Sequence, residues 1–138
     1  MFAVFVYGTL KPGEVNYRGY CQGKAIAAFP AYALGDLYAL SLGYPAMTPG
    51  REKVWGALLK FNDPEVLQSL DRLEEYEPGR RREENEYQRQ EISIYHPSGE
   101  LLGTAWAYLM EREKIEKLGG RSIPSGCWQN ASNSVPNS

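Results

Sequence analysis

The sequence predicts a mixed α/β fold, in which short strands form a sheet and one clearly amphipathic helix packs on it. Runs of β-branched and aromatic residues, separated by Gly and Pro turn signals, lie on both sides of a single segment with strong helical periodicity. The chain has 138 residues, of which 43% are hydrophobic, which suits one domain with one core. We therefore expect one domain over residues 1–128 and a polar, disordered tail over residues 129–138.

The overall composition disfavours several classes of protein. A net charge of −2 and a pI of about 5.5 do not provide the basic surface that nucleic-acid binding requires. No apolar run approaches the ~18 residues of a membrane span, and the N-terminus lacks the pattern of a signal peptide. Cys21 and Cys127 are too few and too far apart for a disulfide framework or a zinc site. We expect a cytoplasmic protein, monomeric or homodimeric, without nucleic-acid or membrane partners.

The first predicted strand, Phe2–Val6, is continuously apolar and so is expected to be buried on both faces. It runs into the turn Tyr7, Gly8, Thr9 and Leu10. A glycine there permits a positive φ and close approach of the backbone to a ligand, and successive amides around such a turn can form an anion-binding nest. This arrangement suits a substrate carboxylate. An ordinary turn after a first strand explains the same residues without any ligand.

The remaining elements alternate strands and turns on either side of the helix. The only histidine, His96, lies in a predicted hairpin turn and is assigned no role. A loop or a short helical turn is expected at 13–20, and a semi-ordered closing segment at 122–128. Strands are expected at 24–29 and 32–40 (separated at Pro30, with a possible bulge at Gly35), in a short extended piece at 45–47, and at 54–61, 87–95 and 101–110, with a short charged helix at 111–118.

The amphipathic helix begins at Asp63, a good N-cap residue, followed by Pro64, which is favoured at the first helical position. Its apolar side chains share one face: Val66, Leu67, Leu70 and Leu73. With a period of 3.6 residues, Glu74 points roughly 50° from the centre of that face, whereas Glu75 points roughly 150° away, toward water.

Glu74 is therefore expected at the buried edge of the helix. A carboxylate there is unfavourable unless it is paired, hydrogen-bonded or protonated. A salt bridge or a frayed last turn would account for it structurally, and an acid–base role would account for it functionally. The following segment, 77–86, mixes both charges and is interpreted as a solvated loop.

The sequence also lacks the motifs of several kinds of chemistry. It contains no G-x-S-x-G, no P-loop, no dinucleotide fingerprint and no H-E-x-x-H. Neither cysteine is paired with a usable histidine. We therefore expect no metal and no cofactor, and the remaining candidate chemistry is a carboxylate acting beside a backbone nest.

Five segments, spread over nearly the whole chain, together form a distinctive set: Val4–Leu10 (the YGTL loop), Leu70-Asp71-Arg72-Leu73-Glu74 (L-D-x-x-E), Tyr87-Gln88-Arg89 (Y-x-R), Ala105-Trp106-Ala107-Tyr108 (A-x-x-Y) and Ser125-Gly126-Cys127-Trp128 (compare S-G-D-W). This set resembles the gamma-glutamylcyclotransferase-like superfamily, in particular its AIG2-like and gamma-glutamylamine-cyclotransferase-like branch. Two positions depart from its pattern: Glu75 replaces a glycine and Cys127 replaces an aspartate.

The resemblance implies a small, partly closed mixed β-barrel with flanking helices. It also implies an enzyme that cyclises the gamma-glutamyl group of a gamma-glutamyl amine or peptide to 5-oxoproline, as a transferase or lyase. Glu74 would act as general base and then acid, and the amides of Tyr7, Gly8, Thr9 and Leu10 would bind the substrate α-carboxylate. Tyr108 is expected either to donate a hydrogen bond to substrate or to be a core or rim tyrosine.

Two alternatives remain on sequence grounds. The first is a non-catalytic module that binds a small metabolite or acts in a stress or interaction role on the same fold. The second is a related enzyme that removes a gamma-glutamyl group from a larger molecule, such as a biosynthetic intermediate or a crosslinked lysine. The sequence does not fix the leaving group in either enzymatic case.

Overall fold

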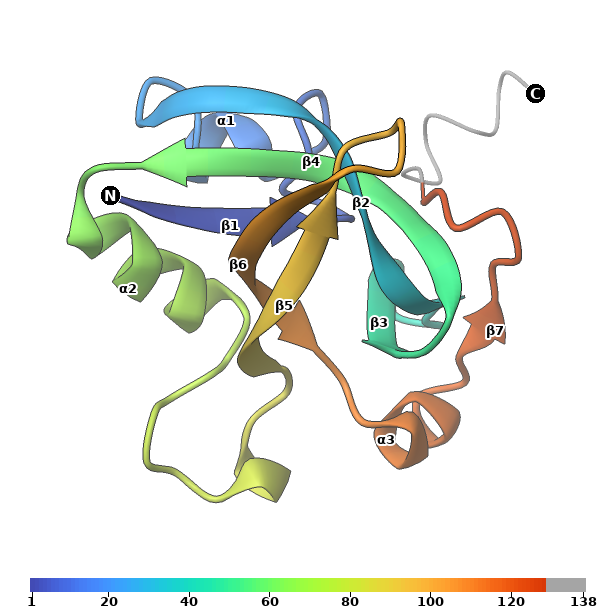
Figure 1. Cartoon of the computed structure of the whole chain (residues 1–138). Coiled ribbons are helices and arrows are strands. Elements are labelled where there is room, and N and C mark those ends of the chain that lie inside the picture. The colour runs from blue at the N-terminus through green and yellow to red at the C-terminus, as the bar shows by residue number, and fades with distance from the viewer. Residues whose placement is uncertain (129–138) are drawn as a thin grey trace.

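The computed structural model describes residues 1–128, and its centre is a small mixed β-barrel (Figure 1). This confirms the mixed α/β barrel expected from the resemblance. The elements are β1 (Phe2–Val6), α1 (Tyr17–Tyr20), β2 (Ala25–Ala39), β3 (Pro45–Pro49), β4 (Glu52–Phe61), α2 (Pro64–Leu73), a 3₁₀ turn η1 (Arg82–Glu84), β5 (Gln88–Tyr95), β6 (Leu101–Leu109), α3 (Arg112–Lys117) and β7 (Arg121–Ser122).

Five strands form the ring of the barrel in the order β2-β4-β1-β6-β5. The ring closes where β5 pairs with β2 at Tyr32 and Tyr95, whose aromatic rings stack with centroids 5.3 Å apart. All neighbours in the ring are antiparallel except β1 and β6, which pair in parallel. Strands β3 and β7 extend β2 outside the ring. The central position of β1, between β4 and β6, explains its continuous apolar sequence.

Strand β2 is continuous through Pro30, so the predicted break there is wrong. Pro30 pairs with Ala57, and residues 25–31 have only β4 as a partner, so the missing N–H of proline faces a side with no ladder. Gly35 is no bulge either: it lies in register with both neighbours, and the register shift falls between residues 25 and 27. A Cβ at Gly35 would lie 2.7 Å from the carbonyl oxygen of Thr48, which explains the glycine.

The closing segment is more ordered than the sequence suggested. Ile123 donates its N–H to the carbonyl of Leu37 at 2.8 Å, and Trp55 donates its own to the carbonyl of Gly126 at 2.8 Å. The Trp128 side chain is buried in the core. Backbone pairing on both β2 and β4 therefore fixes residues 121–128. The tail expected over 129–138 lies outside the described residues.

Helix α2 begins as predicted. The Asp63 carboxylate accepts a hydrogen bond from the N–H of Glu65 at 2.9 Å, and Pro64 occupies the first turn. Val66 and Leu70 are buried in the core cluster that also includes residues of β1 and β4. The helix ends at Leu73, so that Glu74 is its C-terminal cap residue. Packing of the apolar face thus fixes the direction in which the residue after the helix points.

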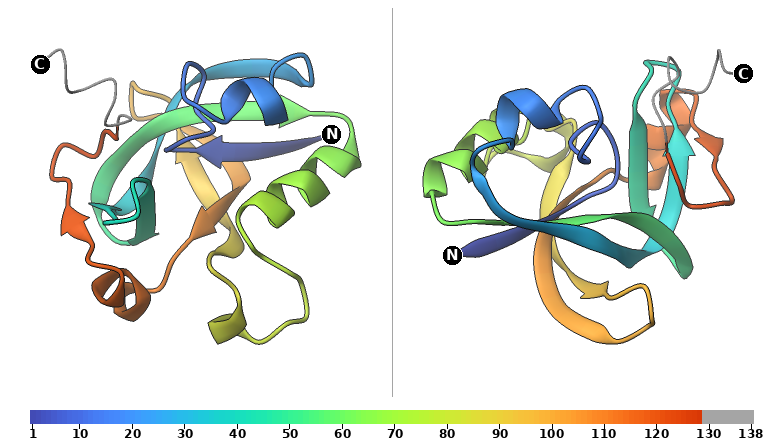
Figure 2. Two further views of the ribbon diagram at one scale, coloured as in Figure 1. Left: turned by 180° about the vertical axis from the view of Figure 1, so that it is seen from behind. Right: turned by 90° about the horizontal axis from the view of Figure 1, so that it is seen from above.

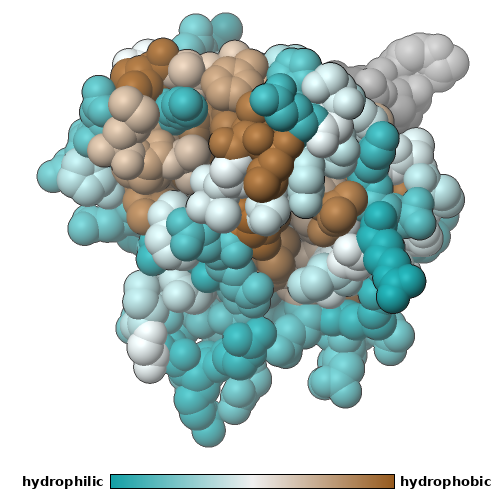
Figure 3. All heavy atoms as spheres, in the orientation of Figure 1, coloured by the Kyte–Doolittle hydropathy of each residue, from teal (hydrophilic) through white to brown (hydrophobic). Residues whose placement is uncertain are grey.

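The elements divide into two ends of the barrel. Helices α1 and α2 lie against one end, whereas β3, β7 and α3 lie at the other (Figure 2). Hydrophilic side chains cover the projecting segment between α2 and β5, while apolar side chains gather on the upper part of the same face (Figure 3). None of the helices in residues 1–128 is long and apolar enough to span a membrane.

Candidate active site

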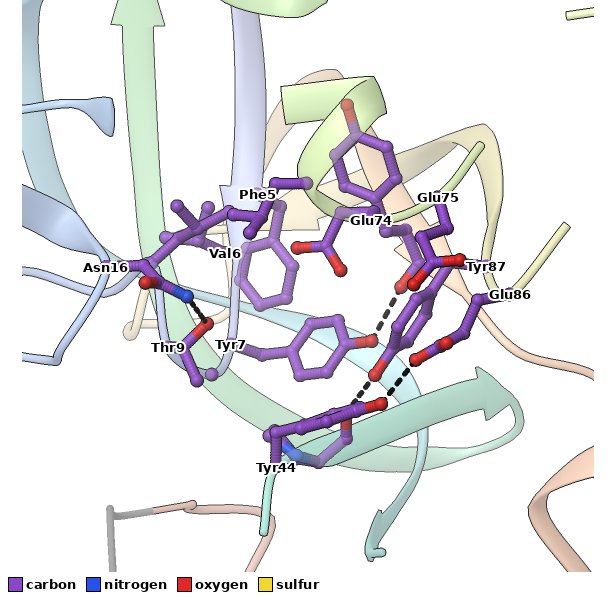
Figure 4. A pocket seen from close by; sticks show the side chains of 15 residues that line it. Phe5, Val6, Tyr7, Thr9, Asn16, Tyr44, Glu74, Glu75, Glu86 and Tyr87 are labelled. Atoms are coloured by element: carbon purple, nitrogen blue, oxygen red, sulfur yellow. Dashed lines mark hydrogen bonds between the residues drawn. The ribbon is translucent and has the colours of Figure 1, made fainter. Parts of the chain in front are cut away.

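A cavity of about 250 Å³ lies where the end of β1 meets the C-terminal end of α2 (Figure 4). All of the site residues expected from the sequence line this one cavity. Its walls consist of Phe5, Val6, Tyr7, Gly8, Thr9, Leu10, Asn16, Tyr44, Pro45, Leu73, Glu74, Glu75, Glu86, Tyr87 and Tyr108. Segments separated by more than sixty residues in the chain therefore meet at the site.

The loop after β1 lines this cavity and contains backbone N–H groups without a protein partner. Asn16 holds the loop in shape, because its backbone N–H donates to the Thr9 carbonyl at 2.8 Å and its Nδ2 donates to Thr9 Oγ1 at 3.0 Å. Lys11 donates its N–H to the Gly8 carbonyl at 3.0 Å, which closes a turn. Within residues 1–128, the N–H groups of Gly8, Thr9 and Leu10 donate to no protein acceptor. These three amides are available to a bound ligand.

Gly8 is required for a different reason from the one expected. Its φ is not positive, so the predicted left-handed conformation is wrong. A Cβ at Gly8 would instead lie 2.6 Å from Cγ of Pro45 at the start of β3. The glycine therefore allows the loop to pack directly on β3, and any larger residue would displace the cavity wall.

Glu74 is fixed by the end of α2 and reaches into the cavity. Its backbone N–H donates to the Leu70 carbonyl at 2.9 Å, and its half-buried side chain makes no hydrogen bond or ion pair with the part of the chain that the structure describes. Burial, and then the negative charge of Glu86, raise the pKa of the Glu74 carboxyl to about 8. The group therefore changes charge close to neutral pH, as a general acid–base residue must.

Three motif residues form a buried network behind Glu74. The Asp71 carboxylate, one turn earlier on α2, accepts hydrogen bonds from Arg89 Nη1 at 2.8 Å and from the Tyr108 hydroxyl at 2.7 Å. The Arg89 guanidinium also lies over the Trp106 ring, 4.7 Å from its centroid. The network ties the end of α2 to β5 and β6 and so holds Glu74 in place. The hydroxyl proton of Tyr108 is used in this contact, so Tyr108 has no hydroxyl proton left to donate to a ligand.

Comparison with known families agrees with this arrangement. A family model described as "Gamma-glutamyl cyclotransferase, AIG2-like" matches residues 4–130. The chain belongs to this family. It is 34% identical over 129 residues to a Vibrio cholerae protein named "Putative gamma-glutamylcyclotransferase", covering 91% of this chain and 93% of that protein. It is also 33% identical over 111 residues to the gamma-L-glutamyl-butirosin B gamma-glutamyl cyclotransferase of Niallia circulans, covering 80% of this chain and 67% of that protein.

Solved structures share the fold. An AIG2-like protein from Mus musculus superposes with a TM-score of 0.67 at 20% identity, covering 94% of this chain and 88% of that one. YkqA from Bacillus subtilis superposes with a TM-score of 0.65 at 24% identity, and the match covers 98% of this chain but only 43% of the YkqA chain. The barrel thus occurs both alone and as part of a longer protein.

The gamma-glutamyl cyclotransferase family pattern has a glycine where this chain has Glu75, and the backbone explains why. Glu75 has a φ of +54°, the left-handed conformation that commonly ends a helix and favours glycine. Its side chain is exposed, as predicted, and it also forms part of the cavity rim. The substitution therefore adds a carboxylate at the rim and places a non-glycine residue in a strained conformation.

Two tyrosine hydroxyls of the site support the backbone of the cavity wall. The Tyr7 hydroxyl donates to the Tyr108 carbonyl at 2.6 Å and accepts a hydrogen bond from the N–H of Met47 at 3.2 Å. The Tyr87 hydroxyl donates to the Pro45 carbonyl at 2.7 Å. Burial raises the pKa of both phenols, so they remain protonated. These contacts join β1, β3, β5 and β6 around the cavity.

Glu86 is a site residue that the sequence analysis missed. The segment 77–86 was expected to be a solvated loop, but Asn85 is buried and accepts hydrogen bonds from the N–H of Glu77 at 3.0 Å and from Arg80 Nε at 2.8 Å. This turns the next residue inward, where the Tyr44 hydroxyl donates to Glu86 Oε2 at 2.5 Å. No local pattern marked Asn16, Tyr44 or Glu86, because their positions depend on contacts between distant segments.

Another hollow, of about 520 Å³, lies beside β1 and β6. Its walls are mostly apolar, and its charged residues are Lys60 and Glu91. Its carboxylate within the described residues, Glu91, is exposed and accepts a hydrogen bond from Thr104 Oγ1 at 3.2 Å. The smaller cavity at the end of α2 is therefore the candidate active site.

Proposed function

We propose that this chain converts the gamma-glutamyl group of a gamma-glutamyl amine or peptide into 5-oxoproline and releases the amine. The observation that carries the proposal is the unpartnered carboxyl of Glu74, with a pKa of about 8, in the same cavity as the free amides of Gly8, Thr9 and Leu10. The name of the Niallia circulans relative, a gamma-glutamyl cyclotransferase, supports the same reaction class.

The loop would hold the substrate through its α-carboxylate. The three free N–H groups are neutral donors near a cavity wall, and such donors bind a carboxylate without bringing a competing cation into the site. Fixing the α-carboxylate also fixes the neighbouring α-amine. A ring closure then gains most of its rate from holding the amine near the γ-carbonyl.

Glu74 would transfer a proton from the α-nitrogen of the substrate to the leaving nitrogen. As a carboxylate it removes a proton from the α-ammonium, and the free amine nitrogen attacks the γ-carbonyl carbon to form the ring C–N bond. The protonated Glu74 then donates that proton to the leaving nitrogen as the original C–N bond breaks. The ring nitrogen loses its second proton as it becomes the lactam N–H, and the released amine takes up this proton and leaves as its ammonium ion. The developing oxyanion is stabilised by the loop amides. A pKa near 8 allows the residue to act in both directions.

A second candidate is a related enzyme that acts on a gamma-glutamyl group carried by a larger molecule. The specific observation in its favour is the name of the Niallia circulans relative, a gamma-glutamyl cyclotransferase of gamma-L-glutamyl-butirosin B. The chemistry at Glu74 would be the same, and only the leaving group would differ.

Both free cysteines are compatible with a reducing cytoplasm as the site of action.

The test is release of 5-oxoproline from a panel of gamma-glutamyl amines, gamma-glutamyl dipeptides and glutathione. Glu74→Gln keeps the size of the side chain but removes the basic oxygen, so kcat should fall by a factor of roughly 10² to 10⁴. Glu77→Gln is the matched control, because Glu77 is exposed and lies outside the cavity. It should retain the activity of the unmodified chain.

Two results would contradict the proposal. One is the absence of 5-oxoproline release by the unmodified chain with every member of the panel, combined with measurable binding of those compounds, which would identify a non-catalytic binding module. The other is undiminished release by Glu74→Gln, which would remove the assigned acid–base role.

A further inference from the structure

The candidate cavity has two chemically different ends. One end is lined by the loop residues Gly8, Thr9 and Leu10, whose N–H groups donate to no acceptor within residues 1–128, and by Asn16, which is hydrogen-bonded to Thr9. Figure 4 shows Thr9 and Asn16 on one side of Glu74, and Glu75 and Glu86 on the other. No lysine or arginine lines the cavity in the part of the chain that the structure describes. A carboxylate ligand is therefore favoured at the amide end and disfavoured at the acidic end.

This polarity orients a gamma-glutamyl substrate. Its α-carboxylate belongs at the amide end, and the γ-carbonyl and the scissile nitrogen then lie near Glu74. The leaving group, attached to the far side of the γ-carbonyl, extends toward Glu86 and Tyr44. The side chains at that end consequently contact the part of the substrate that varies from one gamma-glutamyl compound to another.

Glu86 is held in place at that end by two contacts. Its backbone N–H donates to the Glu75 carbonyl at 3.1 Å, and its Oε2 accepts the hydrogen bond from the Tyr44 hydroxyl. Its second carboxylate oxygen, Oε1, accepts no hydrogen bond from residues 1–128. An oriented, half-buried carboxylate with one free oxygen can accept a hydrogen bond from a ligand without further rearrangement.

The arginines of the same loop do not neutralise Glu86. Arg80 donates to Asn85 and to the Glu75 carbonyl, Arg81 pairs with the exposed Glu83 and Glu84, and Arg82 pairs with Glu111 at 3.0 Å. The negative charge of Glu86 is thus felt inside the cavity, and it contributes to the raised pKa of Glu74. A positive group on the substrate would offset it.

We propose that Glu86 determines substrate specificity, and that the preferred substrates are gamma-glutamyl amines whose leaving amine carries a second positive charge, as a diamine or polyamine does. This inference rests on the proposed function and adds the charge of the leaving group to it. Leaving groups with a carboxylate and no cation, such as the glycine end of a gamma-glutamyl peptide, are disfavoured because the negative charge of Glu86 repels them.

Three substrates of matched length test the proposal: the mono-gamma-glutamyl amides of 1,5-diaminopentane, pentylamine and 5-aminopentanoate. They differ only in a positive, neutral or negative far end. At low salt we expect kcat/KM to fall in that order, by roughly tenfold at each step for a charge a few ångströms from Glu86. In the unmodified chain the preference should shrink as salt is raised, because the rim is open to solvent.

Glu86→Gln should reduce the ratio of kcat/KM for the cationic and neutral substrates by roughly tenfold. Glu83→Gln, which removes the same charge from an exposed position in the same loop, should leave that ratio unchanged. The ratio within one variant is the readout, so a general loss of activity does not affect it. The salt dependence of the unmodified chain shows whether the preference is electrostatic, and the Glu86→Gln ratio shows whether Glu86 causes it.

The outcomes separate the two proposals. Release of 5-oxoproline from none of the three substrates, nor from the wider panel, overturns the proposed function. Release from all three at equal rates and at every salt concentration, with Glu74→Gln inactive, overturns the role of Glu86 and leaves the proposed function standing. A charge preference that survives Glu86→Gln unchanged also overturns that role.

Discussion

Two carboxylates one turn apart at the end of α2 have opposite environments. Asp71 is buried against β5 and β6 and has an arginine and a tyrosine hydroxyl as partners. Glu74 reaches into the cavity and has no partner within the described residues. Because both lie on one short helix, the difference comes from the strands that each side chain meets. The same helix end provides a structural anchor and, three residues later, the acid to which we assign the acid–base role.

The pKa values follow this difference. Burial raises the pKa of Asp71, but the hydrogen bonds from Tyr108 and Arg89 act against that rise. Burial and the charge of Glu86 raise the pKa of Glu74 to about 8, and no hydrogen bond opposes them. An unpartnered buried acid is unfavourable for stability. Its presence beside a well-paired acid is the pattern expected if this site sacrifices stability for the proposed chemistry.

The largest expected effect on stability comes from breaking the ion pair between Asp71 and Arg89. Arg89→Met leaves the Asp71 carboxylate buried without its counter-charge, so the free energy of unfolding should fall by about 3–5 kcal/mol at pH 7. Urea denaturation followed by circular dichroism measures it. Arg81→Met, which removes an exposed pair, is the control and should cost less than ~1 kcal/mol. Equal losses in the two variants would show that the Asp71 network does not hold α2.

Neutralising Glu74 should have the opposite effect and raise the free energy of unfolding. The folded-state pKa of Glu74 lies above its ordinary value of 4.5, so folding favours the protonated form and stability falls as the pH rises from 4.5 to about 8. Gln resembles the protonated acid and does not ionise. Glu74→Gln should therefore be about 2–3 kcal/mol more stable than the unmodified chain at pH 9 and nearly equal to it at pH 4. Urea midpoints at the two pH values measure this, and a variant that is less stable at pH 9 would contradict it.

A milder change, at Tyr108, compares the contributions of the two hydrogen-bond donors to Asp71. Tyr108→Phe removes one of the two donors to Asp71 while Arg89 remains, so the free energy of unfolding should fall by about 1–1.5 kcal/mol. The loss should be well below that of Arg89→Met. Thermal unfolding of both variants in the same buffer makes the comparison, and a larger loss for the phenylalanine variant would reverse the assigned order of the two partners.

Much of the Asp71–Glu74 region could be predicted from the sequence, because local rules determine it. The N-cap Asp63, Pro64 and the 3.6-residue apolar spacing fix where α2 begins and which face it buries. That spacing already placed Glu74 toward the core and Glu75 toward water. The apolar run of β1 similarly fixed the loop that faces Glu74.

The acidic end of the cavity could not be predicted, because its contacts join segments far apart in the chain. Glu86 turns inward because the preceding residue, Asn85, is buried and hydrogen-bonded to Glu77 and Arg80. The hydrogen-bond partner of Glu86, Tyr44, comes from the loop before β3. A mixed run of charges in the sequence is typical of a solvated loop, and nothing local marks one member as buried. The reason for Gly8, contact with Pro45, is likewise visible only in three dimensions.

The smallest expected effect concerns the pKa of Glu74 and the neighbouring charge that raises it. Several groups face Glu74: the charges of Glu75 and Glu86 at the rim, the buried hydroxyls of Tyr7, Tyr87 and Tyr108, and the hydroxyl of the half-buried Tyr44, which donates to Glu86. Because burial keeps the phenols protonated, Glu86 is the ionised neighbour that raises the pKa of Glu74.

Glu86→Gln should therefore lower the midpoint at which kcat/KM rises with pH, from near 8 in the unmodified chain, by about half a unit. The neutral pentylamine substrate is used for both proteins, so that ionisation of its own amine cancels from the difference. Burial of Glu74 remains in the variant, and its midpoint should stay well above 4.5. Glu83→Gln provides the control. A midpoint unchanged by Glu86→Gln would mean that burial alone sets the ionisation of Glu74, and a midpoint near 4.5 would mean that burial contributes little.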